Sequence, residues 1–120
     1  MPMKNFLKSA SLDEYIEWCG KSLDSVSVRL LLCIIDHPAR DFNFYLGKMS
    51  SYLPGDGEYK RLAVAGSMMR LYGVGIIEDD NHNLDFGRNF MEAKCRINKS
   101  LEDKKLVVRN FMQPYAETNK

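Results

Sequence analysis

The chain has 120 residues, of which 45% are hydrophobic and 28% are charged, with 17 Lys and Arg residues against 16 Asp and Glu residues. This composition excludes a disordered chain and is typical of a single folded domain with one core. The one long apolar run, at residues 30–35, is too short to cross a bilayer, and the N-terminus lacks the parts of a signal peptide. We therefore expect a cytoplasmic protein without membrane contact.

Enzymatic and metal-dependent functions are not indicated by the sequence. No serine, cysteine or carboxylate lies in a recognisable nucleophile motif, and neither His37 nor His82 has a His or Cys neighbour at metal-ligand spacing. Cys19, Cys33 and Cys95 are odd in number and have apolar neighbours, which favours reduced thiols in the core. We expect a protein that is not an enzyme and that holds no metal or other cofactor.

Two helices are predicted in the first third of the chain. The first covers residues 12–19, between a serine at capping-box spacing and Gly20, a favoured residue just past a helix end. The second covers residues 25–37 and is nearly all apolar, which predicts a buried helix that ends before Pro38. A buried strand is the alternative for this second segment.

Two further helices follow. Residues 43–53 have apolar side chains at helical spacing, with Asn43 or Asp41 available as the cap. The stretch PGDG then ends this helix and prepares the next, which is predicted over residues 58–72 and is halted by Gly73.

On a helical wheel, this fourth helix has one apolar half and one half that is small in the middle and basic near both ends. The apolar half contains Leu62, Val64, Ala65, Met68, Met69, Leu71 and Tyr72. The other half contains Tyr59, Lys60, Ala63, Gly66, Ser67 and Arg70. We expect the apolar half to face the core and the second half to face a groove or a backbone. Arg61 falls inside the apolar arc and must extend out to solvent or find a partner.

The last third of the chain is predicted to contain a hairpin and a helical extension. Residues 75–79 and 83–86 form the two short strands, because the residues between them suit a tight turn. Residues 88–112 then form one long helix or two, which end at Pro114. Their apolar stripe consists of Phe90, Ala93, Ile97, Leu101, Val108, Phe111 and Met112.

The order helix, extended link, helix, turn, helix and hairpin over about residues 23–88 resembles a winged helix-turn-helix domain of bacterial regulators such as the MarR and PadR families. The most specific piece is LYGVGII at residues 71–77, which looks like the point where the recognition helix turns into the wing. The resemblance implies a mainly α fold with a small β-hairpin, in one domain over residues 1–120. The winged-helix core would carry an added N-terminal helix at about 12–19 and a C-terminal helical extension at about 89–113.

The same resemblance implies binding of double-stranded DNA, with residues 59–71 as the recognition helix in the major groove. By position, the implied DNA-contacting residues are Tyr59, Lys60, Arg61, Ala63, Ser67, Arg70, Lys48 and Arg88. Added helices in these families often form a homodimer. The dimer interface expected here consists of Phe90, Ile97, Leu101, Val108 and Phe111.

Two functions therefore stay open. The first is a DNA-binding transcriptional regulator. The second is a winged-helix protein-interaction module, an adaptor or inhibitor that uses an acidic wing and the C-terminal helix. The wing supports the second function, since Glu78, Asp79, Asp80 and Asp85 would lie beside DNA phosphates and oppose the counterion release that drives DNA binding.

Overall fold

The computed structural model describes residues 14, 17–18, 21–80 and 91–118. These residues form a mainly helical structure with a small antiparallel sheet, which confirms the prediction in outline. The described elements begin with α3 (Ser25–Asp36), α4 (Phe42–Met49), the short 3-10 helix η1 (Ser50–Tyr52) and α5 (Gly57–Gly73). They continue with β1 (Ile77–Asp79), β2 (Cys95–Ile97), the 3-10 helix η2 (Lys99–Lys104) and α7 (Lys105–Thr118).

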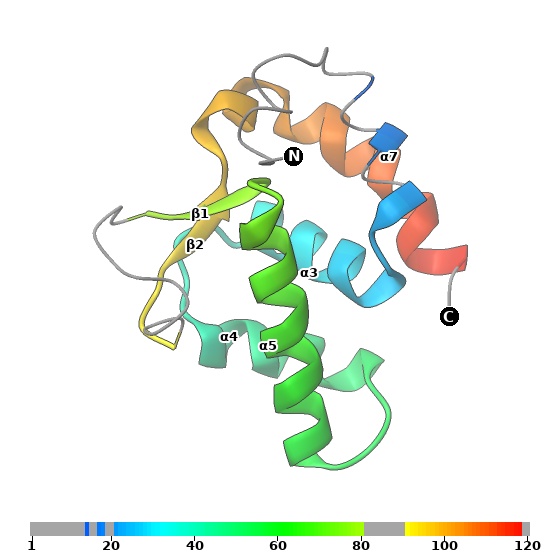
Figure 1. Cartoon of the computed structure of the whole chain (residues 1–120), viewed down its shortest axis with the longest axis vertical. Coiled ribbons are helices and arrows are strands. Elements are labelled where there is room, and N and C mark those ends of the chain that lie inside the picture. Colours follow the sequence, from blue (N-terminus) through cyan, green and yellow to red (C-terminus); the bar gives the residue numbers. More distant parts are fainter. Residues whose placement is uncertain (1–13, 15–16, 19–20, 81–90, 119–120) are drawn as a thin grey trace.

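Helix α3 is the centre of the core. It packs against α7 on one side and against α4 and α5 on the other (Figure 1). Val28, Leu31 and Ile34 are completely buried, and burial of each such side chain contributes about 1.5–3 kcal/mol. The helix begins at Asp24, whose carboxylate accepts a hydrogen bond of 3.1 Å from the backbone N–H of Ser27. The helical prediction for this segment is therefore confirmed against the strand alternative.

Helices α4 and α5 each begin at an aspartate. Asp41, rather than Asn43, caps α4 by accepting from the backbone N–H of Phe44 at 3.0 Å. Asp56 caps α5 in the same way, and Gly55 before it has a φ of +90°, which favours glycine in this turn. The predicted third helix is divided, because its last turn is the 3-10 helix η1. The predicted fourth helix matches α5 to within one residue at each end.

The sheet differs from the predicted hairpin. Strand β1 pairs antiparallel with β2, with Asp79 opposite Cys95, and Cys95 also forms a bridge with Arg40. Residues 95–97 were predicted to be helical, and this prediction was wrong. Their side chains alternate between buried and half-buried, which is the period of a strand. The predicted partner strand at residues 83–86 lies outside the described residues.

The C-terminal extension also differs from the prediction. Asn98 caps η2 by accepting from the backbone N–H of Ser100, so helical structure starts about ten residues later than expected. Pro114 was predicted to end the last helix, but it lies inside α7, which continues to Thr118. Inside a helix, a proline removes one backbone N–H and its ring crowds the carbonyl of residue i−4, at a cost of about 3 kcal/mol. The helix nevertheless continues through Pro114, and it packs closely on α3.

The described residues of the predicted N-terminal helix, Glu14, Glu17 and Trp18, are helical. Trp18 packs against the core. The helical residue Lys21 pairs with Glu17 at 2.8 Å. None of the described helices combines the length and the apolar character that a membrane span needs.

Candidate functional site on the outer face of helix α5

The face of α5 that packs on the core differs from the predicted one. Ser67 was expected to face DNA, but it is only 2% exposed. It lies three residues after Val64 and four before Leu71, on the row of side chains that contacts α3. Ala63, another expected groove residue, is half-buried and packs against the core. Ser67 is therefore not available for DNA contact in this fold, and Ala63 is only partly exposed.

The opposite face of α5 is apolar and exposed. The exposed fractions are 54% for Tyr59, 67% for Leu62, 36% for Met69 and 38% for Tyr72. Gly66 lies between them, and a Cβ atom added there would meet no other atom within 4 Å. The prediction that Leu62, Met69 and Tyr72 face the core was wrong. We call these five residues the outer face of α5.

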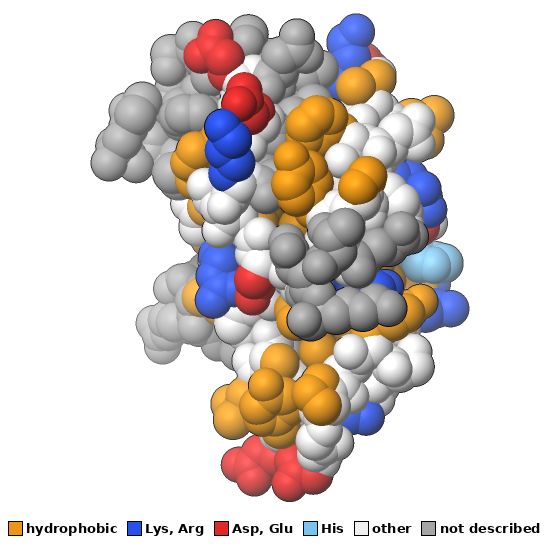
Figure 2. Space-filling model, turned by 90° about the vertical axis from the view of Figure 1, so that its right-hand side faces the viewer, with side chains coloured by type: hydrophobic (Ala, Val, Ile, Leu, Met, Phe, Trp, Pro, Cys, Tyr) orange, Lys and Arg blue, Asp and Glu red, His pale blue; other side chains and the backbone are white. Residues whose placement is uncertain are grey.

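Hydrophobic side chains also gather next to the start of α5. In Figure 2 they form a group at the lower end of the molecule, over η1 and the first turns of α5. Tyr52 of η1 is 59% exposed, and the guanidinium of Arg29 lies over its ring at 4.4 Å. Exposed apolar patches on a small protein usually mark a contact surface.

Two of the three basic side chains of α5, Lys60 and Arg70, donate hydrogen bonds within the chain. Arg70 Nη1 lies 3.3 Å from the carboxylate of Asp24 and donates to Ser27 Oγ at 3.0 Å. Lys60 Nζ donates to Ser50 Oγ at 3.4 Å. The guanidinium of Arg61 lies 5.6 Å from the centre of the Phe42 ring. A phosphate would therefore compete with these contacts for Lys60 and Arg70, whereas Arg61 is exposed at the surface.

We predict a structural role for Arg70, which joins α5 to the start of α3. Arg70→Ala should lower the free energy of unfolding by about 1 kcal/mol, mainly because the buried Ser27 hydroxyl loses its donor, while the exposed ion pair adds little. Urea unfolding measures this effect. Arg61→Ala is the control and should change stability less, because Arg61 has only a distant ring contact. Equal stability of Arg70→Ala and the wild type would contradict the structural role.

Among the other predicted DNA-contacting residues that the structure describes, Lys48 does not extend this face into a basic surface. Lys48 lies on α4, with its Nζ 5.6 Å from the centre of the Phe44 ring. It lines a cavity between α3, α4 and α7. Tyr59 is exposed at the start of α5. Arg88 lies outside the described residues.

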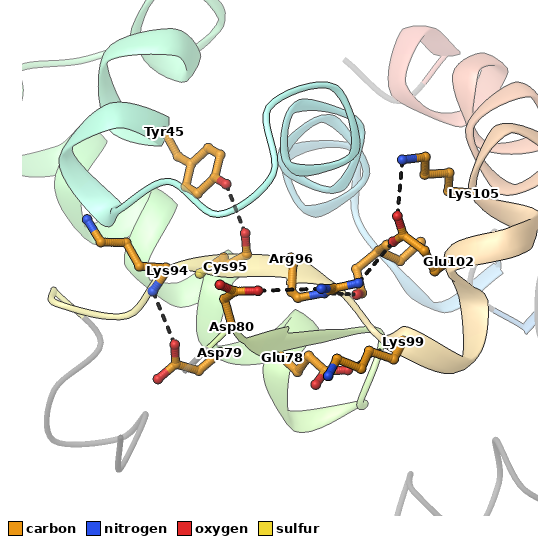
Figure 3. A network of polar contacts seen from close by, with 11 residues as sticks. Tyr45, Glu78, Asp79, Asp80, Lys94, Cys95, Arg96, Lys99, Glu102 and Lys105 are labelled. Atoms are coloured by element: carbon orange, nitrogen blue, oxygen red, sulfur yellow. Dashed lines mark hydrogen bonds and ion pairs between the residues drawn. The ribbon is translucent and has the colours of Figure 1, made fainter. Parts of the chain in front are cut away.

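The described acids of the hairpin accept hydrogen bonds or form ion pairs within the chain (Figure 3). Glu78 accepts a hydrogen bond of 2.7 Å from the backbone N–H of Lys99. Asp79 is almost completely buried and accepts from the backbone N–H of Lys94. These contacts attach β1 to residues on both sides of β2. The sequence could not show them, because they depend on the pairing of β1 with residues 95–97.

Arg96 links the remaining described acid of the hairpin to η2. Its guanidinium lies between Asp80, at 3.4 Å, and Glu102, at 3.2 Å (Figure 3). The described part of the hairpin therefore carries acids that stabilise its own fold. The fourth acid of the predicted acidic wing, Asp85, lies outside the described residues.

Tyr45 connects three segments beneath the sheet. Its hydroxyl lies 2.6 Å from the carbonyl oxygen of His37 and 3.1 Å from that of Cys95, and it accepts from the backbone N–H of Arg40 at 3.2 Å. Burial raises the pKa of this phenol well above its ordinary value. The hydroxyl therefore stays protonated and holds the end of α3 against β2.

The described cysteines, half-buried Cys33 and buried Cys95, are free thiols. Burial and the nearby carboxylate of Asp79 raise the pKa of Cys95 to about 12, and burial also raises the pKa of Cys33. Both side chains therefore stay neutral. Cys19 lies outside the described residues. Within the part of the chain that the structure describes, no cluster of His, Cys, Asp and Glu could hold a metal ion.

The predicted dimer stripe is mostly part of the core. Ile97, Leu101 and Val108 are buried within the same chain, because β2, η2 and α7 pack around α3. The interpretation of these three as an interface was wrong. Phe111 is exposed and stacks on Tyr115, with 5.8 Å between the ring centres. Phe90 lies outside the described residues.

An ion pair fixes α7 to the end of α3, beside the cavity of about 220 Å³ that Lys48 lines. Arg109 donates to both carboxylate oxygens of Asp36, at 2.7 and 3.0 Å. These bonds hold the pKa of Asp36 below its ordinary value of 3.8. Because the folded pKa is lower than the unfolded one, the stabilisation is present above pH 3.8 and is lost as the pH falls through the folded pKa.

Arg109→Gln should therefore lower the free energy of unfolding at pH 7 by about 0.5–1 kcal/mol, the range for a partly exposed bidentate pair. At about pH 3 the difference from the wild type should shrink, because Asp36 becomes protonated in the unfolded chain and then in the folded one. Urea unfolding of both proteins at each pH measures it. A difference that does not change with pH would exclude this ion pair as the cause.

No protein-family model, curated protein or solved structure matches the chain. The described surface therefore carries the evidence for function. The feature of that surface with the clearest chemical character is the outer face of α5.

Proposed function

We propose that the chain is a winged-helix module that acts by protein–protein contact through the outer face of α5. The element order supports the winged-helix interpretation: α3 is followed by an extended residue that pairs with β2, then by α4, α5, β1 and β2. Cys95 pairs with Asp79 on one side and with Arg40 on the other. The extended link between the first two helices therefore borders the sheet, which is the arrangement expected of this fold.

The observation that carries the proposal is the exposure of Leu62 together with its aromatic and methionine neighbours on one helix face. Burial of apolar surface is favourable by about 25 cal/mol per Å². Binding of a protein partner that covers this face is therefore favoured. Methionine and tyrosine are well suited to such contacts, because methionine adapts its shape and tyrosine presents a large ring with little loss of rotamer freedom.

DNA binding is the second candidate function. It is favoured by the position of α5, which is the helix that would enter the major groove in a winged-helix protein. Against it, the exposed side of this helix is mostly apolar, and two of its three cations, Lys60 and Arg70, already have partners within the chain. Phosphate neutralisation by Lys and Arg supplies most of the affinity of proteins for DNA.

Titration of mixed-sequence duplex DNA with the full chain, at low and at physiological salt, tests the proposal against this candidate. We expect the chain to show no salt-sensitive binding to the DNA. Salt-sensitive binding that is lost in Arg61→Gln but retained in Asn43→Gln, an exposed position on α4, would overturn the proposal and support a DNA-binding regulator.

A further inference from the structure

The outer face of α5 has an internal symmetry. Its midpoint lies between Ala65 and Gly66, close to the middle of the helix Gly57–Gly73. Leu62 and Met69 lie at equal distances on either side of this midpoint, and Tyr59 and Tyr72 lie at equal, larger distances. The order of side chains is therefore the same from either end: aromatic, aliphatic, small, small, aliphatic, aromatic.

The symmetry also holds around the helix. At about 100° per residue, Leu62 and Met69 are only about 20° apart, so they lie on one line along the helix. On the same scale, Tyr59 and Tyr72 lie about 70° to either side of that line. The arrangement of these four side chains therefore looks nearly the same after a half-turn about an axis that passes through the centre of the face at right angles to the helix.

We infer that the partner of this face is a second copy of the same chain, with the two α5 helices antiparallel. This inference rests on the proposed function and names its partner. In a two-fold dimer, each residue that contacts another is contacted by it in return, so the surface must be complementary to itself. Leu62 then lies opposite Met69 of the partner subunit, and the reverse contact is identical.

The centre of the face permits a close approach. Gly66 has no side chain, a Cβ atom there would meet nothing within 4 Å, and the neighbouring Ala65 is small. Two helix backbones can therefore approach closely where they cross, while Leu62 and Met69 fill the space on either side. The two helix dipoles run in opposite directions in this arrangement, which is favourable.

The charges of α5 that border the face lie at its end and at its edges: Glu58 is exposed at its N-terminal end, where Gly73 of the partner subunit would lie. Arg61 and Arg70 lie on opposite edges of the face, about 180° apart on the wheel. One edge of the dimer carries the two copies of Arg61 and the other edge carries the two copies of Arg70. Along each edge, the two arginines are separated by nine residues, or about 13 Å of helix. This distance exceeds the Debye length at physiological salt, so their repulsion is screened.

The size of the face sets the expected affinity. Its four exposed apolar side chains present about 400 Å² per chain, estimated from the areas that such side chains bury. Two such faces bury less than a standard interface of about 1,600 Å². We therefore expect a dimer that dissociates in the micromolar range.

The molecular mass of the full chain in solution, measured by sedimentation over a range of concentrations, tests the inference. The wild type should shift from monomer to dimer as its concentration rises. Leu62→Glu should stay monomeric, because it places a carboxylate in an apolar contact. Leu106→Glu is the matched control, since Leu106 is 64% exposed on α7, and it should dimerise like the wild type. Urea unfolding of each variant verifies its fold.

A charge-swap experiment tests the antiparallel geometry. Leu62→Lys and Met69→Glu should each dimerise more weakly alone, and their equimolar mixture should form a heterodimer that weakens with salt. A parallel pair would place residue 62 opposite residue 62 and would not give this result. A wild type that stays monomeric at all concentrations, or a dimer that is lost in Leu106→Glu but kept in Leu62→Glu, would overturn the inference.

The proposed function and the self-pairing fail in different ways. A photoreactive residue in place of Leu62 should form an adduct of twice the mass of the chain. An adduct with a different protein would retain the proposed function and overturn the self-pairing. The absence of any adduct with the chain alone would overturn the self-pairing, and its absence also in a cell extract, where other proteins are present, would overturn both.

Discussion

Tyr45→Phe is expected to lower the free energy of unfolding by about 2–3 kcal/mol, although the aromatic ring is retained. The hydroxyl of Tyr45 interacts with the backbone of His37, Arg40 and Cys95 beneath the sheet. Removal of this hydroxyl leaves buried polar groups without that partner, and each such group costs about 1–3 kcal/mol. Urea unfolding measures the change, and the m-value of the variant should equal that of the wild type.

Tyr52→Phe is the matched control for Tyr45→Phe. Tyr52 is 59% exposed, and its ring lies under Arg29, a contact that phenylalanine retains. We expect its stability to stay within about 0.5 kcal/mol of the wild type. A Tyr45→Phe protein as stable as Tyr52→Phe would show that the three segments are held together by packing alone.

Val108→Asp is expected to lower the free energy of unfolding by at least about 4 kcal/mol, because it buries a carboxyl group among apolar side chains. Val108 is completely buried between α7 and the core, whereas the adjacent Val107 is 52% exposed. Val107→Asp is therefore the control and should leave stability nearly unchanged. Thermal unfolding of the two variants measures the difference.

This pair of variants also decides between the two interpretations of the C-terminal stripe. If Val108 were at a dimer surface, Val108→Asp would give a folded monomer of normal stability. A folded monomer would contradict the packing of α7 on α3 and would restore the predicted interface.

Helices α3 and α5 were predictable from local pattern. The apolar run of α3 between Asp24 and Pro38 indicates a buried segment with a defined start and end. The stop at Gly73 and the start after PGDG fix α5 within one residue. These signals are local, so they do not depend on which segments meet in the fold.

The strand β2 was not predictable in the same way. Its three residues lie inside a stretch whose apolar side chains also fit a helical stripe. What makes them a strand is their pairing with β1 and with Arg40, which lies 55 positions before Cys95 in the chain. Non-local pairing of this kind leaves little trace in a short segment.

The outer face of α5 was missed for a related reason. The helix has apolar side chains on two adjacent arcs, one with Val64, Met68 and Leu71 and the other with Leu62 and Met69. A wheel combines both arcs into one apolar half, and only the position of α3 decides which arc is buried. Ser67 is small and lies on the buried side of the helix together with Val64, Met68 and Leu71. The surface that carries the proposed function was therefore assigned to the core.

The most direct test of protein contact at α5 is site-specific photocrosslinking of the full chain in the presence of duplex DNA. A photoreactive residue replaces Leu62 in one protein and Leu106, which has a similar exposed fraction on α7, in the control. We predict a protein adduct from position 62, at twice the mass of the chain, and none from position 106. An adduct between position 62 and DNA, with no protein adduct there, would contradict the proposed function.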